Sequence, residues 1–259
     1  MEAPPDVRVY LTGEVMVERG RRLLRERDLP SRQGRLAFAY LCLQRGEPVA
    51  KDVLADALWG DDLPPRWEVA LNAIASKLRV ALGSVGLDRT AVLPVAFGCY
   101  ALRLPGRTWI DVDAAHEAVH DAEGALRAGA SEAAYGDALV ASIITRRPFL
   151  PAEGAAWVEE RRGQLAADRL RALDCMVQCL LRNGEMELAE LRAEEAVALD
   201  PYRESSYQSL MELHASVGNR AAALRVYERC VIRLRDDLGV SPTSALQTLH
   251  RRLLVEAAV

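Results

Sequence analysis

The sequence predicts a mainly α-helical protein with a small β component, organised as two domains that join near residue 105. Three observations lead to this fold class. Apolar and polar residues alternate in short runs near the N-terminus, residues 64–83 carry an apolar stripe at helical spacing, and residues 184–230 contain a repeat with a period of 34 residues. A chain of 259 residues has room for two domains of ordinary size, here 1–105 and 106–259.

The first domain begins with β character and continues with helices. Three short runs that predict an antiparallel meander of strands are residues 7–13, 15–18 and 20–24. Ser31 is a suitable N-cap for a helix over about 32–45, which carries the densest apolar cluster of this half. A second, shorter helix is expected over 48–60.

The stretch from Pro64 to Gly83 predicts the third helix. Its apolar stripe consists of Trp67, Leu71, Ile74, Leu78 and Leu82. Proline is favoured in the first helical turn and glycine just beyond the end, so we expect Gly83 to follow the last turn. At about 100° per residue, the opposite side carries Arg66, Val69, Asn72, Ala73, Ser76 and Lys77.

A hairpin follows the third helix. Residues 91–95 and 99–104 have β character and flank the turn Ala96-Phe97-Gly98. Strands, three helices and a closing hairpin are the elements of a winged helix-turn-helix, so the sequence predicts this fold for residues 1–105.

Three motifs of this domain give a more specific likeness: Leu54-Ala-Asp-Ala-Leu-Trp59, Leu78-Arg-Val-Ala-Leu-Gly83 and Gly98-Cys-Tyr-Ala-Leu-Arg-Leu-Pro105. The order of elements resembles the DNA-binding domain of OmpR-type response regulators. The motifs resemble the actinobacterial SARP regulators, in which such a domain precedes a helical bacterial transcriptional activator domain. The segment Asp111-Val-Asp-Ala-Ala-His-Glu-Ala-Val119 is similar to the one that opens that second domain.

The second domain is predicted to be all-α and tetratricopeptide-like. Helical patterns cover residues 113–128, 131–145 and 154–182. Beyond them, the positions separated by 34 residues are Gly184 and Gly218, Ala189 and Ala223, Ala193 and Tyr227, and Ala196 and Cys230. Thirty-four residues is the tetratricopeptide period. A final capping helix is expected from Ser244 to Leu254.

The resemblance implies a set of DNA-binding residues. In a winged helix the third helix enters the major groove and the hairpin reaches an adjacent minor groove. The candidates carried over onto this chain are Arg66, Asn72, Ser76 and Lys77 on the helix, Arg79 at its flank, Tyr100 and Arg103 on the wing, and Arg32 and Lys51 near helix N-termini. Asn72 is suited to adenine, and the cations to phosphate or guanine.

The resemblance also implies a function and partners. We expect a sequence-specific transcription regulator, an activator that can serve a secondary-metabolite gene cluster. Its partners would be double-stranded promoter DNA, bound at direct repeats by a head-to-tail homodimer, and RNA polymerase. The second domain would serve self-association or polymerase contact.

An alternative function follows from the apolar residues on the same surface. Val69, Ala73 and Val80 occupy much of the outward side of the third helix, and the wing tip has no basic residue. Exposed apolar surface marks protein interfaces. The chain could therefore be a protein-interaction adaptor built on tetratricopeptide repeats, with a winged helix that binds DNA weakly or not at all.

The charges favour DNA binding only slightly. Residues 1–105 hold 15 Lys and Arg against 13 Asp and Glu, whereas the remainder holds 18 against 24. The first domain is thus weakly basic and the second acidic, which is the direction that a DNA-binding N-terminal half requires.

Other chemistry has little support in the sequence. No phosphate-binding loop, zinc-protease motif or nucleophile elbow occurs, so we expect no enzyme and no cofactor. His116 and His120 lack a third ligand nearby, and the five scattered cysteines fit core positions, so no metal site is expected. No apolar run approaches the roughly 20 residues of a membrane span, and the N-terminus is unlike a secretory signal. We therefore expect a cytoplasmic protein with no membrane partner.

Overall fold

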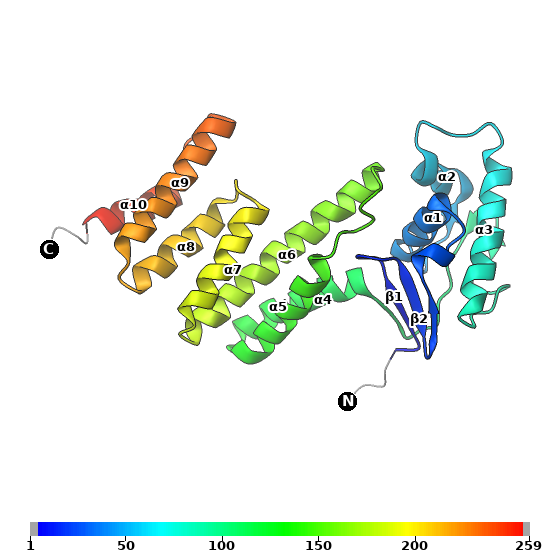
Figure 1. Ribbon diagram of the computed structural model, residues 1–259, viewed down its shortest axis with the longest axis horizontal. Helices are drawn as coiled ribbons and strands as arrows, with labels where there is room; N and C mark the ends of the chain where they lie inside the picture. Colours follow the sequence, from blue (N-terminus) through cyan, green and yellow to red (C-terminus); the bar gives the residue numbers. More distant parts are fainter. Residues whose placement is uncertain (1–4, 256–259) are drawn as a thin grey trace. The chain divides into compact units, whose positions relative to one another are not determined.

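The computed structural model describes residues 5–255, and its elements follow the predicted order (Figure 1). The fold is mainly α with a small β component, and a winged helix-turn-helix precedes an all-α, tetratricopeptide-like domain. The described residues form two compact units. The first contains residues 5–115 with 144–165, and the second contains residues 116–143 with 166–255.

The N-terminal sheet contains the predicted meander and one strand that the sequence did not reveal. Its strands are β1 (Val7–Tyr10), β2 (Met16–Arg19), β3 (Arg22–Leu24) and β7 (Thr108–Ile110), in the order β3-β2-β1-β7. The meander is antiparallel, whereas β7 runs parallel to β1 and pairs Val7 with Thr108. The segment after the wing thus completes the first sheet.

Three α-helices follow the first three strands of this sheet. They are α1 (Arg32–Leu43), α2 (Lys51–Trp59) and α3 (Trp67–Ser84), and a 3₁₀ turn, η1 (Glu26–Asp28), precedes them. The predicted cap of α1 is confirmed, because the Ser31 hydroxyl accepts a hydrogen bond from the Gly34 N–H at 3.1 Å.

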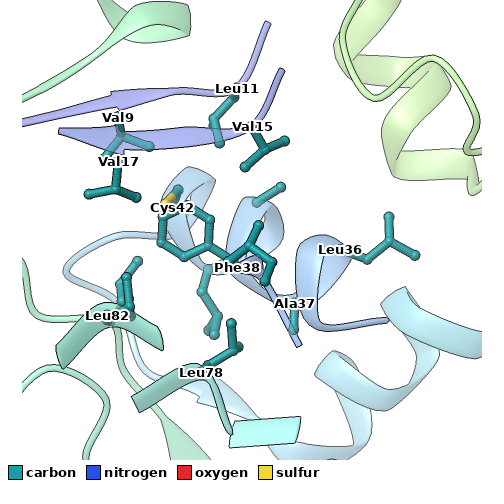
Figure 2. Close-up of a cluster of buried hydrophobic side chains, with 14 of the residues drawn as sticks. Val9, Leu11, Val15, Val17, Leu36, Ala37, Phe38, Cys42, Leu78 and Leu82 are labelled. Carbon is teal, nitrogen blue, oxygen red and sulfur yellow. The ribbon is translucent and has the colours of Figure 1, made fainter. Parts of the chain in front are cut away.

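The core of the first unit lies between the sheet and the helices (Figure 2). Val9 and Val17 point from the sheet toward Phe38 of α1, and Leu78 and Leu82 of α3 approach from the other side. All five are almost fully buried. Because burying one such side chain contributes about 1.5–3 kcal/mol, this layer fixes the inner face of α3.

Residues 144–165 belong to the same core. Phe149 is buried there, and Trp157 lies edge-on to Phe149 and to Tyr40 of α1. The Trp157 indole N–H donates to the Ala57 carbonyl of α2 at 2.9 Å. The first unit therefore includes a segment from well beyond the wing.

The end of α3 differs from the sequence prediction. Gly83 lies inside the helix, and Gly86, at φ +82°, takes the left-handed position after the last turn. The Leu87 N–H donates to the Leu82 carbonyl and the Gly86 N–H to the Gly83 carbonyl, which is the Schellman pattern. Both glycines fit the sequence rule, and only the hydrogen bonds show which one ends the helix.

The wing is a small sheet of its own. Strands β5 (Val95–Ala96) and β6 (Cys99–Tyr100) form the hairpin, and β4 (Val49–Ala50) pairs with β6 to give the order β4-β6-β5. Since β4 leads directly into α2, the wing is anchored to the helical layer at its base.

The remaining helices are α4 (Asp111–Arg127), α5 (Ser131–Thr145), α6 (Ala156–Arg182), α7 (Met186–Leu199), α8 (Glu204–Ser216), α9 (Arg220–Leu238) and α10 (Ser244–Val255). The 34-residue period is visible in the helices, since α7 begins at Met186 and α9 at Arg220. Figure 1 shows α7, α8 and α9 packed side by side, and Leu246 and Leu249 of α10 bury against this group.

Small side chains allow the helices of the second unit to approach closely. Ala122 of α4, Ala138 of α5 and Ala172 of α6 are fully buried in one cluster, together with Cys175 and Cys179. All five cysteines are free thiols, and burial raises the pKa of Cys175 to about 11. No helix within residues 5–255 combines the length and the apolar character that crossing a membrane requires.

Candidate nucleic-acid interface

Helix α3 has a buried side and an exposed side, as its sequence predicts. Leu71, Leu78 and Leu82 are buried, and Trp67 and Ile74 are half-buried against the same core. The apolar stripe is thus confirmed as the inner face, which leaves the opposite face open to a ligand.

The exposed side of α3 carries most of the predicted DNA-binding residues. Arg66 is the N-cap residue, and Asn72, Ser76 and Lys77 follow along the exposed surface. Valines share this surface: Val69 is 67% and Val80 is 52% exposed. The surface therefore offers an amide, a hydroxyl and two cations among small apolar side chains.

Asn72 is held by a residue of the wing. The Tyr100 hydroxyl donates a hydrogen bond to Asn72 Oδ1 at 2.8 Å. Tyr100 is only 1% exposed, and burial raises the pKa of its phenol. The ring therefore lies in the core rather than on the wing surface, and its hydroxyl orients the Asn72 amide.

Two other predicted residues connect the wing to the helices. The Arg79 Nε–H donates to the Leu93 carbonyl at 2.9 Å, which pins the segment before the wing to α3. The Lys51 backbone N–H donates to the Gly98 carbonyl at 3.1 Å, and its ammonium lies 6.0 Å from the centre of the Tyr100 ring. Arg103 is exposed just beyond β6.

Arg32 lies in a different environment. Its Nη2 is 2.6 Å from Glu153 Oε2, and the Glu153 side chain is 0% exposed. Arg35 pairs with the other oxygen of the same carboxylate at 2.5 Å. Arg32 therefore neutralises a buried acid that lies 121 positions later in the chain.

The remaining predicted cations are distinguished by a lack of acidic partners. Within residues 5–255, no carboxylate pairs with Arg66, Lys77, Lys51 or Arg103. Elsewhere in the first unit, Arg8, Arg25, Arg45 and Arg107 each have a carboxylate partner. Arg19, Arg21, Arg22 and Arg89 of this unit likewise have no carboxylate partner among the described residues. The positive charge available to an external anion therefore includes α3 and the wing but is not confined to them.

One exposed residue was missed as a candidate. Phe97 forms the tip of the wing, is fully exposed at 105% and has a positive φ of +52°. The signal in the sequence is the bulky residue before Gly98 in a two-residue turn, a position that favours Asn, Asp or Gly.

Fold and surface together define a winged-helix protein with a tetratricopeptide-like helical domain, which is the organisation of the SARP-type transcriptional regulators. The profile of the bacterial transcriptional activator domain matches residues 110–254. The chain therefore belongs to this family, and the resemblance seen in the sequence is confirmed.

Several relatives share most of this chain. The transcriptional regulatory protein EmbR of Mycobacterium tuberculosis is 28% identical over 223 residues, which are 85% of this chain and 57% of EmbR. AfsR of Streptomyces coelicolor is 30% identical over 86% of this chain and 22% of its own length. DnrI of Streptomyces peucetius is 29% identical over 86% of this chain and 84% of DnrI.

A solved structure has the same fold. Mycobacterium tuberculosis EmbR, in complex with a low affinity phosphopeptide, superposes with a TM-score of 0.87 at 25% identity. The match covers 97% of this chain and 66% of that one. The chain thus spans between about half and two thirds of the length of EmbR, and these relatives are named as regulatory proteins.

Proposed function

We propose that this chain is a sequence-specific DNA-binding transcription regulator, and an activator, in which residues 1–105 bind promoter DNA. Helix α3 enters the major groove with Arg66, Asn72, Ser76 and Lys77, while Arg79, Lys51 and Arg103 contact the backbone beside it. Residues 106–259 support self-association or contact RNA polymerase. The protein acts in the cytoplasm.

The observation that carries this proposal is the combination of an oriented amide and unpaired cations on one exposed helix face. An asparagine held at one oxygen keeps its N–H₂ group and a second lone pair, so it can still pair with adenine N7 and N6. A cation without a carboxylate partner can contact a phosphate, and release its counterion, without first breaking an ion pair inside the protein. Arg32 is the weakest of the nine candidates, because moving its side chain to a phosphate would remove one ion-pair partner from the buried Glu153.

Binding can be tested with DNA from upstream of the chain's own gene and its neighbours, and with duplexes enriched from a random pool. Wild-type protein is expected to bind a preferred duplex with an affinity that falls as salt rises. The double variant Arg66→Ala/Lys77→Ala should bind more weakly, and its slope of log K against log salt should be shallower by about 1–2.

The matched control removes two paired cations from the same unit. Arg25→Ala/Arg107→Ala lowers the charge equally, but these side chains face Glu14 and Asp6. Its salt slope should match that of wild type. Equal slopes for both double variants would show that net charge, and not the α3 surface, governs binding.

We further propose that two copies bind direct repeats head to tail. A duplex with two half-sites in the same orientation should then bind two copies, and inversion of one half-site should weaken the second binding event. Equal affinity for direct and inverted arrangements would contradict this assembly.

A second candidate function is the protein-interaction adaptor, which the exposure of Val69 and Val80 favours. The double variant Val69→Ser/Val80→Ser separates the two functions. If α3 serves only a protein partner, no duplex will be enriched, and the variant will lose that partner. If α3 binds DNA, the variant will keep most of the affinity and salt dependence.

A further inference from the structure

The wing ends in a very narrow tip. Val95 pairs with Tyr100 and Ala96 pairs with Cys99, so only Phe97 and Gly98 connect the two strands. Both have positive φ, +52° and +77°, which is the type I′ turn. The neighbouring side chains are small, and Phe97 is the one bulky group at the tip.

Phe97 occupies a conformation that disfavours it. A left-handed backbone is comfortable for glycine or asparagine but strained for an aromatic residue with a Cβ. Its ring is fully exposed, so no burial within the described chain offsets this strain. Contact between the Phe97 ring and another molecule would explain why a strained and exposed aromatic side chain stands at this position.

The unpaired cations near the tip indicate a negatively charged binding partner. Lys51 donates its backbone N–H to the tip residue Gly98, and Arg103 follows the hairpin, and neither pairs with a carboxylate of the described residues. Tyr100 of the same hairpin orients Asn72 on α3. Lys51 thus lies beside the tip, and Arg103 lies at the base of the hairpin, where its backbone N–H donates to the Val92 carbonyl at 2.8 Å. A hairpin with an apolar tip, with cations at its side and base, and joined to the helix face that carries the amide fits a polyanion with an apolar interior. Duplex DNA is such a polyanion.

We propose that Phe97 is a wedge that enters the minor groove beside the α3 site and partly unstacks one base step. The proposal rests on the proposed function and adds a DNA-deforming contact to it. The minor groove is about 6 Å wide, so it admits a two-residue tip with one large side chain. Architectural proteins use apolar wedges, phenylalanine among them, to open base steps from this side.

The wedge makes specificity depend on bases that α3 does not touch. Pyrimidine–purine steps unstack most easily, so a preferred site should hold such a step at a fixed distance from the α3 contacts. Duplexes enriched from the random pool are therefore expected to share this step at their flank.

The decisive variant is Phe97→Asn. Asparagine accepts the left-handed conformation, and Asn-Gly is a favoured type I′ turn, so the wing should be at least as stable as in wild type. The melting temperature is expected to be unchanged or higher, whereas affinity for the enriched duplex should fall roughly tenfold or more, because base–aromatic stacking is lost.

Unstacking can be observed directly with 2-aminopurine placed at successive steps of that duplex. Wild type should raise the fluorescence at one flanking step, Phe97→Leu should keep much of this rise, and Phe97→Asn should abolish it. The control Val217→Asn replaces an exposed valine of the second unit and should behave as wild type.

The outcomes separate the two proposals. If a duplex is enriched but Phe97→Asn binds it with wild-type affinity and fluorescence, the wedge is wrong while DNA binding by α3 stands. Such a result would assign the tip to a protein partner. If no duplex is enriched at all, the proposed function fails and the wedge fails with it.

Discussion

Arginines that join helices in the second unit differ in their role from the arginines on the α3 and wing surface of the first unit. In the second unit arginines join helices: Arg169 pairs with Glu195, Arg171 with Glu123 and Asp168, and Arg203 with Asp174. On α3 and beside the wing of the first unit, Arg66 and Arg103 have no carboxylate partner within the described chain. Similar side chains thus form internal ion pairs between the helices of the second unit and remain unpaired on the α3 and wing surface of the first.

The difference shows why net charge is a weak guide to DNA binding. The first 105 residues have an excess of only two positive charges, which would favour nucleic acid only slightly. Several arginines of this unit are paired with carboxylates, however, whereas Arg66 and Lys77 on α3 are not. Where charges are paired matters more than how many there are.

The largest effect is expected from breaking a helix-joining arginine. Arg171 Nε and Nη2 donate to both oxygens of Glu123 at 2.8 and 2.9 Å, and Nη1 donates to the nearly buried Asp168 at 3.0 Å. Arg171→Ala leaves two carboxylates without this donor and should lower the free energy of unfolding by about 2–4 kcal/mol. Urea unfolding followed by circular dichroism measures this change.

The matched control for Arg171→Ala is Arg235→Ala in the same unit. Arg235 is well exposed and, among residues 5–255, forms an ion pair only with its neighbour Asp236, so its removal should leave stability unchanged. Equal destabilisation by both variants would mean that arginines stabilise this unit through general charge rather than by joining α4 to α6.

A smaller effect is expected from the hydrogen bond that connects the wing to α3. Tyr100→Phe keeps the buried ring but removes the donor to Asn72. Discrimination against a changed A·T pair should fall roughly fivefold to tenfold, the lower part of what one bidentate base contact provides. The salt slope should stay constant, because no phosphate contact is lost.

A double-mutant cycle decides whether Tyr100 acts through Asn72. In the background of Asn72→Ala, replacing Tyr100 by Phe should change discrimination no further. An additional loss in that background would show that the Tyr100 hydroxyl contacts DNA itself, as the sequence suggested.

Local patterns predicted most of the fold because they report on nearby residues. The stripe of α3, the Ser31 cap and the common spacing of α7 and α9 each depend on positions within one helix or one repeat. Strand β7 was missed because Thr108 pairs with Val7, about a hundred positions away. The sequence around residues 108–110 carries no signal that this segment pairs with β1.

The candidate site shows the same limit at the level of side chains. Helical periodicity predicted that Arg66 and Lys77 are exposed, but it could not show that they lack carboxylate partners. Arg32 looked equivalent in sequence, and only the fold brings Glu153 to it. Alternation within a two-residue strand likewise could not show that Tyr100 faces the core.

The smallest expected effect is a pH dependence of the free energy of unfolding, which should appear where a carboxylate pairs with an arginine and not where a carboxylate is unpaired. The hydrogen bond from Arg171 holds the pKa of Glu123 below its ordinary value, against the opposing effect of burial. A carboxyl group with a lowered pKa in the folded state adds stability above its unfolded pKa of about 4.3 and loses it as pH falls through the folded pKa. Glu123→Gln should therefore cost about 0.5–1 kcal/mol at pH 7, and this cost should shrink toward zero near pH 3.

The control Glu117→Gln removes an exposed carboxylate of the same helix that has no ion pair among the described residues. Its unfolding free energy should stay close to that of wild type, because no arginine of the described residues pairs with this carboxylate. The two pH curves together test the comparison between the units. If Glu123→Gln ran parallel to wild type down to pH 3, the Arg171 pair would contribute packing and not charge. Paired arginines of the second unit and unpaired cations of α3 would then differ in their contacts but not in a measured electrostatic contribution to stability.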